Sequence, residues 1–181
     1  SPELKREVGY LSSDMQLNAN WTGREHISLF EDVKGRGRLA GELVARFDLD
    51  TKQKVKHLSS GNKQKLAIIL AFIGEPKILI MDEPTRGLDP LLQNELYDIL
   101  RGYVNGERAA FLSSHNLAEV QRLCDSVAII KNGAVVDARS MKELRDMKMH
   151  VVSASSEQPF DASALRNLGA TVVSHRNGEI M

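Results

Sequence analysis

The chain of 181 residues lacks disulfide potential, an excess of charge of either sign and any long apolar run. Cys124 is the only cysteine, so no disulfide can form within the chain, and a cytoplasmic location is natural. The 24 basic and 24 acidic residues balance, which gives no electrostatic attraction to nucleic acid. The longest apolar run, around residues 66–73, is far too short to span a membrane, and the chain opens without a signal-peptide pattern. Any membrane attachment must therefore come through a partner.

A phosphate-binding P-loop is also missing. Such a loop needs Gly-Lys-Ser/Thr, because the lysine meets the β- and γ-phosphates while the hydroxyl meets Mg²⁺. None of the thirteen glycines is followed by lysine. We therefore expect the chain alone to bind nucleoside triphosphates weakly or not at all.

What the chain does contain is an acidic pair at the end of an apolar segment. Residues 77–81 are almost continuously apolar and too short for a helix, which predicts a buried parallel strand ending at Asp82 and Glu83. Ligands bind at the carboxyl edge of such sheets. There, one acid can hold Mg²⁺ through water while the other polarises an attacking water. The alternative is a solvated loop, or an aspartate that caps a helix.

A helix start precedes this strand. Residues 63–73 are good helix formers that end before Gly74 and Pro76, and Ser59 or Ser60 can cap them. Hydroxyls, the small Gly61 and unpaired amide N–H groups together make an anion site. The alternative is an ordinary serine cap. The order of helix, strand and acidic pair favours phosphate chemistry.

These segments resemble the nucleotide-binding domain of ABC transporters, over about residues 5–150. Residues 58–62 (Leu-Ser-Ser-Gly-Asn) resemble the signature motif, Asp82 and Glu83 the Walker B aspartate and catalytic glutamate, residues 87–89 the D-loop, and His115 the H-loop histidine. The Walker A motif and the strands before it have no counterpart. The chain therefore resembles a cassette truncated just after its P-loop helix.

The resemblance implies a P-loop NTPase-type (RecA-like) α/β fold with a partial parallel sheet, a helical subdomain and a small C-terminal α+β extension. The implied segments are residues 1–19 for the Q-loop strand and loop, 20–75 for the helical subdomain with the signature helix, 76–148 for the second half of the ATPase core, and 149–181 for the extension.

The resemblance also implies roles for individual residues. In an intact relative, ATP lies between two head-to-tail cassettes, so the signature segment would serve the opposite subunit's γ-phosphate and Asp89 would pack across the interface. Asp82 would hold Mg²⁺ through water, Glu83 would orient or deprotonate the water, and His115 would contact the γ-phosphate. The implied nucleotide-binding residues are Ser59, Ser60, Gly61, Asn62, Asp89 and Ser13. The other histidines, His26, His57, His150 and His175, are interpreted as structural or exposed.

Ser13 stands where many relatives carry the Q-loop glutamine, and a serine is too short to reach Mg²⁺ and the attacking water. Asp14 and Gln16 are weaker alternatives for that role. A small residue followed by aspartate resembles the drug and polyketide exporter branch of the family, which favours export.

The implied function is an ATP-binding and ATP-hydrolysing subunit that powers transport, with ATP and Mg²⁺ as ligands. Its partners would be a transmembrane permease subunit, which would hold it at the inner face of the cell membrane, and a second nucleotide-binding domain. One alternative is an incomplete module that lends its signature helix to a partner. Another is a chromosome-maintenance or repair ATPase, which is disfavoured because the chain has no sustained heptads.

Local patterns predict further elements. Thr22 and Glu25 form a capping box before one helix, residues 35–37 break it, and a second helix carries Leu39 and Leu43. Pro90 should begin a helix with Leu91, Leu92, Leu96, Ile99 and Leu100 facing inward. A strand at 109–112 should precede a helix at 117–123 capped by Asn116, and Asn132-Gly133 predicts a type I′ hairpin. The tail should contain strands at 149–154 and 171–174 around a helix at 162–168. Trp21 is either a contact for the membrane partner or a core anchor.

Overall fold

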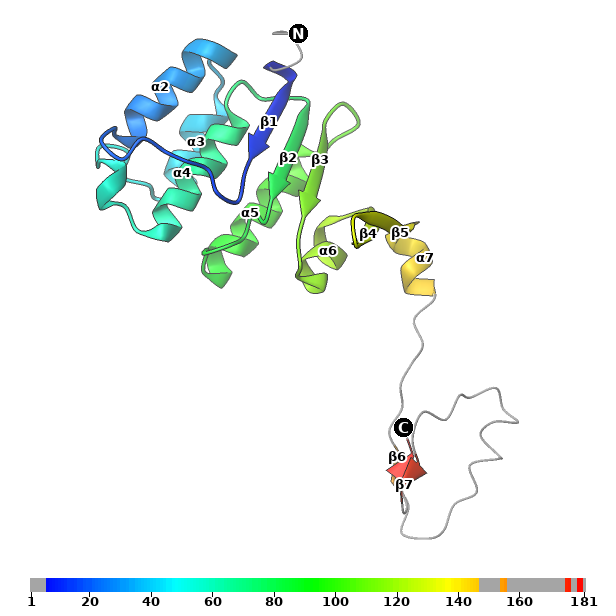
Figure 1. Ribbon diagram of the computed structural model, residues 1–181. Helices are drawn as coiled ribbons and strands as arrows, with labels where there is room; N and C mark the ends of the chain where they lie inside the picture. The colour runs from blue at the N-terminus through cyan, green and yellow to red at the C-terminus, as the bar shows by residue number, and fades with distance from the viewer. Residues whose placement is uncertain (1–5, 147–153, 156–174, 177–178, 181) are drawn as a thin grey trace. The chain divides into compact units, whose positions relative to one another are not determined.

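The structure is a computed structural model that describes residues 6–146, 154–155, 175–176 and 179–180 (Figure 1). The chain divides into two compact units, residues 1–124 and 125–181. The elements of the first unit are β1 (Val8–Leu11), α2 (Gly23–Lys34), α3 (Leu39–Arg46), a 3₁₀ turn (Val55–His57), α4 (Ser60–Phe72), β2 (Ile78–Asp82), α5 (Pro90–Tyr103), β3 (Ala109–Ser113) and α6 (Leu117–Leu123). The four segments proposed from the sequence stay a prediction.

The first unit is built on a parallel sheet of three strands in the order β1-β2-β3 (Figure 1). Met81 of β2 lies beside Leu11 on one side and Leu112 on the other, and Asp82 lies beside Ser113. The predicted parallel α/β fold is therefore confirmed. This register brings the carboxyl ends of β2 and β3 to the same edge, with the acidic pair on it.

The two faces of the sheet differ in burial. Leu11, Leu79 and Met81 are at most 1% exposed and belong to the same core as α4. On the other side of the strands, Tyr10, Ile78, Ile80 and Phe111 are exposed, from 37% to 67%. The expectation that residues 77–81 form a strand buried throughout is therefore wrong for alternate residues, because successive side chains of a strand point to opposite faces.

Helix α4 is the centre of this core. Ser59 caps it, its Oγ accepting the Asn62 N–H at 3.2 Å. Every residue from Leu66 to Ile73 is at most 3% exposed, so the C-terminal part of the helix is buried on all sides. The helix also approaches β1 closely: a Cβ atom added to Gly9 would lie 2.1 Å from the Ala71 carbonyl oxygen. Glycine is therefore required at that position.

Helix α2 begins and ends as its local chemistry predicts, and α3 buries part of its expected apolar face. Thr22 Oγ1 accepts the Glu25 N–H at 3.2 Å, and Glu25 Oε2 accepts the Thr22 N–H at 2.6 Å, which confirms the capping box. Gly35 ends α2 with a φ of 99°, which a side chain would strain. Leu43 of α3 is fully buried.

Helix α5 confirms its predicted start but not all of its inward face. Pro90 occupies the first turn and Asp89 is the N-cap. Leu96, Ile99 and Leu100 are at most 5% exposed. Leu91, in contrast, is 79% exposed. Its predicted inward position is wrong, because Leu91 shares a helical face with the exposed Asn94 and Asp98 and not with the buried leucines.

The second unit contains a hairpin of β4 (Ser126–Lys131) and β5 (Ala134–Ser140), followed by α7 (Met141–Asp146). Asn132 and Gly133 have φ values of 53° and 77°, as the predicted type I′ turn requires. Beyond it lies a small antiparallel sheet in the order β6-β8-β7, formed by Ala154–Ser155, Glu179–Ile180 and His175–Arg176. The predicted helix at 162–168 and strand at 171–174 lie outside the described residues, and the strand at 149–154 overlaps them only at Ala154.

Candidate functional site

Asp82 ends β2 at the carboxyl edge of the sheet, next to the end of β3, and Glu83 follows it directly. The Ser113 hydroxyl donates to Asp82 Oδ1, and Ser13 hydrogen bonds to the same carboxylate. The hydrogen bond from Ser113, and after it that from Ser13, holds the pKa of Asp82 below its usual value. Asp82 is therefore an anchored, ionised carboxylate at neutral pH.

Glu83 turns the chain sharply after the strand. Its φ is 48°, in the left-handed region that a residue other than glycine rarely adopts. The Glu83 N–H donates to Ser113, whose carbonyl oxygen and Oγ each lie 3.2 Å from the Glu83 nitrogen. Ser113 thus uses its hydroxyl as a donor to Asp82 and as an acceptor from Glu83. Sequence reasoning overlooked Ser113, although its place at the end of the neighbouring strand was a usable signal.

His115 contacts Glu83 directly. The His115 N–H donates to Glu83 Oε1 at 3.1 Å, and His115 Nδ1 lies 2.8 Å from the same oxygen. The His115 side chain is 85% exposed and that of Glu83 only 23%. The imidazole therefore lies at the surface with Nε2 available to a ligand, while the glutamate below it keeps a second oxygen for a water molecule.

The exposed Ser59 and Ser60 lie at the start of α4, and this helix start packs against the loop that follows the acidic pair. A Cβ atom on Gly61 would lie 3.2 Å from the Gly87 carbonyl oxygen, and Gln64 Nε2 donates to the Pro84 carbonyl at 2.9 Å. The two serines themselves are exposed to solvent. The helix start can thus meet an anion carried by another molecule.

Two other predicted residues have local partners. Asp89 Oδ1 accepts the N–H groups of Leu91 and Leu92, each at 3.0 Å, so this residue caps α5. Ser13 reaches Asp82 rather than standing apart from the site. The alternatives Asp14 and Gln16 are exposed.

The remaining histidines fall outside the site. His26 is 5% exposed: its Nε2 accepts the Asn18 N–H at 3.0 Å, and its Nδ1 lies 2.8 Å from the Thr22 carbonyl oxygen. It therefore has the structural role expected of it. Trp21 is 37% exposed, and its ring meets the His26 ring edge-on with the ring centres 5.4 Å apart. It is therefore only partly buried, and both roles considered for it, core anchor and partner contact, stay predictions. His57 is exposed, and the side chains of His150 and His175 lie outside the described residues.

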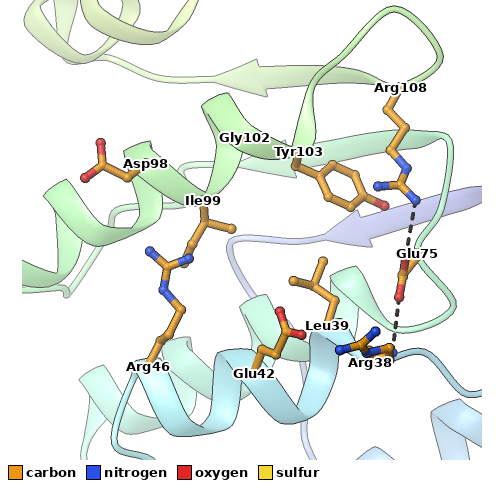
Figure 2. Close-up of a pocket in the computed structure, with 10 residues that line it drawn as sticks. All are labelled: Arg38, Leu39, Glu42, Arg46, Glu75, Asp98, Ile99, Gly102, Tyr103 and Arg108. Atoms are coloured by element: carbon orange, nitrogen blue, oxygen red, sulfur yellow. Dashed lines mark hydrogen bonds and ion pairs between the residues drawn. The ribbon is translucent and has the colours of Figure 1, made fainter.

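A pocket of about 460 Å³ opens between α3 and α5 (Figure 2). Glu75 projects into it and joins two segments: Oε2 lies 3.2 Å from Arg108 Nη2, and Oε1 accepts the Arg38 N–H at 3.1 Å. Tyr103 forms part of the wall, and its hydroxyl donates to the Pro76 carbonyl. No residue proposed from the sequence as part of the site lines this pocket, and two of its charged residues, Glu75 and Arg108, pair with each other.

Comparison with known proteins decides the family. Residues 1–86 match the ABC transporter family. The ABC-type organic anion transporter ABCA8B of Mus musculus is 34% identical over 176 residues, covering 88% of this chain and 11% of that protein. The daunorubicin resistance ATP-binding protein DrrA3 of Streptomyces coeruleorubidus is 33% identical over 150 residues, covering 78% of this chain and 47% of that protein. The chain belongs to the ABC transporter family.

Solved structures agree with this assignment. An ATP-binding subunit of an ABC transporter superposes with a TM-score of 0.72 at 30% identity, over 80% of this chain and 63% of that one. The dimeric ATP-binding cassette MJ0796 bound to ADP and Pi gives a TM-score of 0.68 at 20% identity, over 77% of this chain and 65% of that one, a likeness of fold alone. The ABC transporter chain described here spans about a tenth of the length of ABCA8B and about half that of DrrA3. In the part that the structure describes, no helix could cross a bilayer.

Proposed function

We propose that the chain supplies the acidic edge and the signature helix of an ATP-hydrolysing unit of an ABC transporter, and that this unit powers export. The observation that carries the proposal is the Glu83–His115 pair, which lies beside the anchored Asp82 at the carboxyl edge of the sheet. The Ser13-Asp14 sequence and the similarity to a daunorubicin resistance protein favour export over import.

The donor set fits a magnesium ion that keeps most of its water. Mg²⁺ in phosphate-transfer sites takes one or two carboxylates and completes its shell with water and phosphate oxygens. Asp82 provides one carboxylate with serine hydroxyls beside it, and the described residues contain no cluster of three or more His, Cys, Asp or Glu side chains that could hold a metal. When bound with ATP, Mg²⁺ would neutralise charge on the phosphates.

The protein groups would then divide the work. Glu83 would accept a hydrogen bond from the attacking water and orient it, and His115 would keep that carboxylate in place while its own Nε2 meets the γ-phosphate. Catalysis of this kind is positioning and charge stabilisation. Because the chain has no Gly-Lys pair, the phosphate cradle would come from elsewhere in a complete cassette, and Ser59 to Asn62 would face the nucleotide of a second cassette. A transmembrane permease would hold the pair at the inner face of the membrane.

A chimera tests this function. The P-loop segment of the 30% identical ATP-binding subunit is joined ahead of Ser1, and phosphate release is measured with Mg-ATP. We expect turnover that Glu83→Gln abolishes while ATP still drives dimer formation in light scattering. His115→Ala should slow turnover by about a hundredfold, as loss of one preorganised donor does. Glu107→Gln, an exposed change just before β3 and so at the opposite edge of the sheet, is the matched control. Full activity of either site variant would remove that residue from the site.

The composite arrangement has its own variant. Ser60→Arg places a bulky cation at the start of α4 and should stop hydrolysis by the chimera, while each monomer still binds ATP. A Ser60→Arg chimera that hydrolyses ATP normally would contradict the assignment of this helix start to a partner's nucleotide.

The unmodified chain gives the complementary test. We expect calorimetric titration with Mg-ATP to show weak or no binding, and phosphate release to stay at the level without protein. Micromolar affinity, or turnover that Glu83→Gln abolishes, would show that this chain does not need a P-loop from another segment.

A second candidate function rests on the exposed start of α4. Because Ser59 and Ser60 face solvent without any P-loop in the chain, the chain could act as a module that only completes a partner's site. Adding it to a P-loop-bearing cassette with a disabled signature motif distinguishes the two functions. Restored turnover that Glu83→Gln does not affect would favour the module.

A further inference from the structure

A buried carboxylate lies behind the Glu83–His115 pair. Glu119, in the first turn of α6, is 3% exposed. Its Oε2 accepts two hydroxyls, one from Thr85 Oγ1 at 3.2 Å and one from Ser114 Oγ. Its Oε1 is buried and, among the described residues, has no hydrogen-bond partner. Packing alone does not explain this residue, because an apolar side chain would fill the space without the cost of desolvating a carboxylate.

The two hydroxyls belong to the two segments that carry the site. Ser114 immediately precedes His115, and Thr85 lies two residues after Glu83. These segments are about thirty positions apart in the chain, so one carboxylate ties together loops that follow different strands. The His115 N–H and Nδ1 both meet Glu83 Oε1, and that contact requires the two loops to keep a fixed spacing.

The hydrogen bonds around Glu119 have a defined direction. The Asn116 N–H donates to Ser114 Oγ at 3.0 Å, so the Ser114 hydroxyl proton is directed to Glu119. Thr85 is itself only 8% exposed, which excludes water as an easy substitute for its hydroxyl. Tyr97 is also influenced by this carboxylate: burial first, and then the negative charge of Glu119, raises the pKa of Tyr97, and the Arg122 guanidinium is stacked 4.9 Å from its ring centre.

We propose that Glu119 is a positioning residue that, through Ser114 and Thr85, holds His115 in hydrogen-bond contact with Glu83. Its importance for ATP hydrolysis rests on the proposed function, whereas the positioning itself is a property of the chain without nucleotide.

Amide hydrogen exchange at His115 tests this positioning in the unmodified 181-residue chain. The His115 N–H lies in an exposed loop and donates to the Glu83 side chain, so protection of this N–H from exchange reports the contact with Glu83. Glu83→Ala, which removes the acceptor, sets the unprotected rate. We expect Thr85→Val and Ser114→Ala each to raise the His115 exchange rate about tenfold or more towards that limit, because local opening governs exchange. Glu119→Gln should do the same, because its amide oxygen can replace Oε2 only with the amide N–H groups buried at the Oε1 position, where they have no partner.

Conservative variants separate positioning from general stability. Thr85→Ser and Ser114→Thr keep the hydroxyls and should keep His115 protection within about twofold of the wild-type value. Val120→Ala, a truncation in α6 outside these hydrogen bonds, should lower the melting temperature without a selective change at His115. Unchanged His115 protection in a folded Glu119→Gln protein, or an equal loss of protection in Val120→Ala, would overturn the proposal. These exchange measurements use no ATP. If the variants lose His115 protection as expected but the chimera never hydrolyses ATP, only the proposed function is refuted.

Discussion

Tyr103 offers a quantitative test of how the acidic strand is anchored. Its hydroxyl donates to the Pro76 carbonyl oxygen at 2.6 Å, at the point where the chain enters β2, and its ring packs edge-on against Phe72 of α4. Tyr103 is 4% exposed. Burial raises the pKa of Tyr103 from 10.0 to about 12. The neutral phenol is therefore favoured in the folded protein.

The magnitude follows from that shift. A difference of two pKa units corresponds to about 2.7 kcal/mol of free energy at 1.36 kcal/mol per unit. Because the folded pKa is raised, this stability is fully present below pH 10 and is lost as the pH rises through the folded value near 12. Between pH 9 and pH 11 the tyrosine should cost the folded protein about 1.3 kcal/mol. At pH 9, Tyr103→Phe should lower stability by about 1–3 kcal/mol, because the buried Pro76 carbonyl loses its donor.

Urea unfolding of wild type and Tyr103→Phe at pH 9 and pH 11 measures both effects. The wild type should lose about 1.3 kcal/mol more than Tyr103→Phe over this interval. Other titrating groups, including the lysines and Tyr97, are present in both proteins and cancel in the comparison. Tyr10→Phe, at an exposed position, is the matched control. Equal losses in wild type and Tyr103→Phe would refute the argument that the phenol is held neutral against Pro76.

Two further outcomes test the sheet edge and the core. Ser113→Ala removes the main cause of the lowered Asp82 pKa, so the midpoint of the Asp82 carboxyl titration, followed by NMR, should rise. The control Ser114→Ala should leave that midpoint unchanged. The stability that Asp82 contributes is present above about pH 3.9 and is lost as the pH falls through the pKa of the folded state. Gly9→Ala places a Cβ atom 2.1 Å from the Ala71 carbonyl oxygen, so the urea midpoint should fall by the equivalent of about 1–3 kcal/mol, while Gly41→Ala in α3, where the Cβ atom meets nothing, should not destabilise the protein.

The sequence allowed good prediction wherever the chemistry is local. The Thr22–Glu25 capping box, the Asn132-Gly133 turn and the start of α5 at Pro90 each depend on residues within one turn of each other. The shared edge of Asp82 and His115 was also predictable, because parallel strands must end on the same side of their sheet. These inferences need no knowledge of the rest of the fold.

Burial was harder to predict, because it depends on which elements cover a surface. The apolar segment at 77–81 contains Ile78 and Ile80, which are as apolar as Leu79 and Met81, yet the first pair is exposed and the second buried. Leu91 is likewise as apolar as the buried leucines of α5 but lies on a face of the helix that the core does not cover. Glu119 is the opposite case, since nothing in a charged side chain on a short helix signals that it will be buried.

The backbone of Glu83 shows why such hidden contacts matter to the site. A left-handed conformation at a residue other than glycine costs about 1–3 kcal/mol and persists only where the surroundings enforce it. Here the enforcing contacts come from both strands: the Glu83 N–H meets Ser113, its side chain meets His115, and the buried Thr85 fixes the chain just beyond it. The left-handed turn directs the carboxylate across the strand end towards β3. A local rule would place Glu83 in an extended continuation of β2, so its position at the site follows from the contacts of Ser113, His115 and Glu119 together.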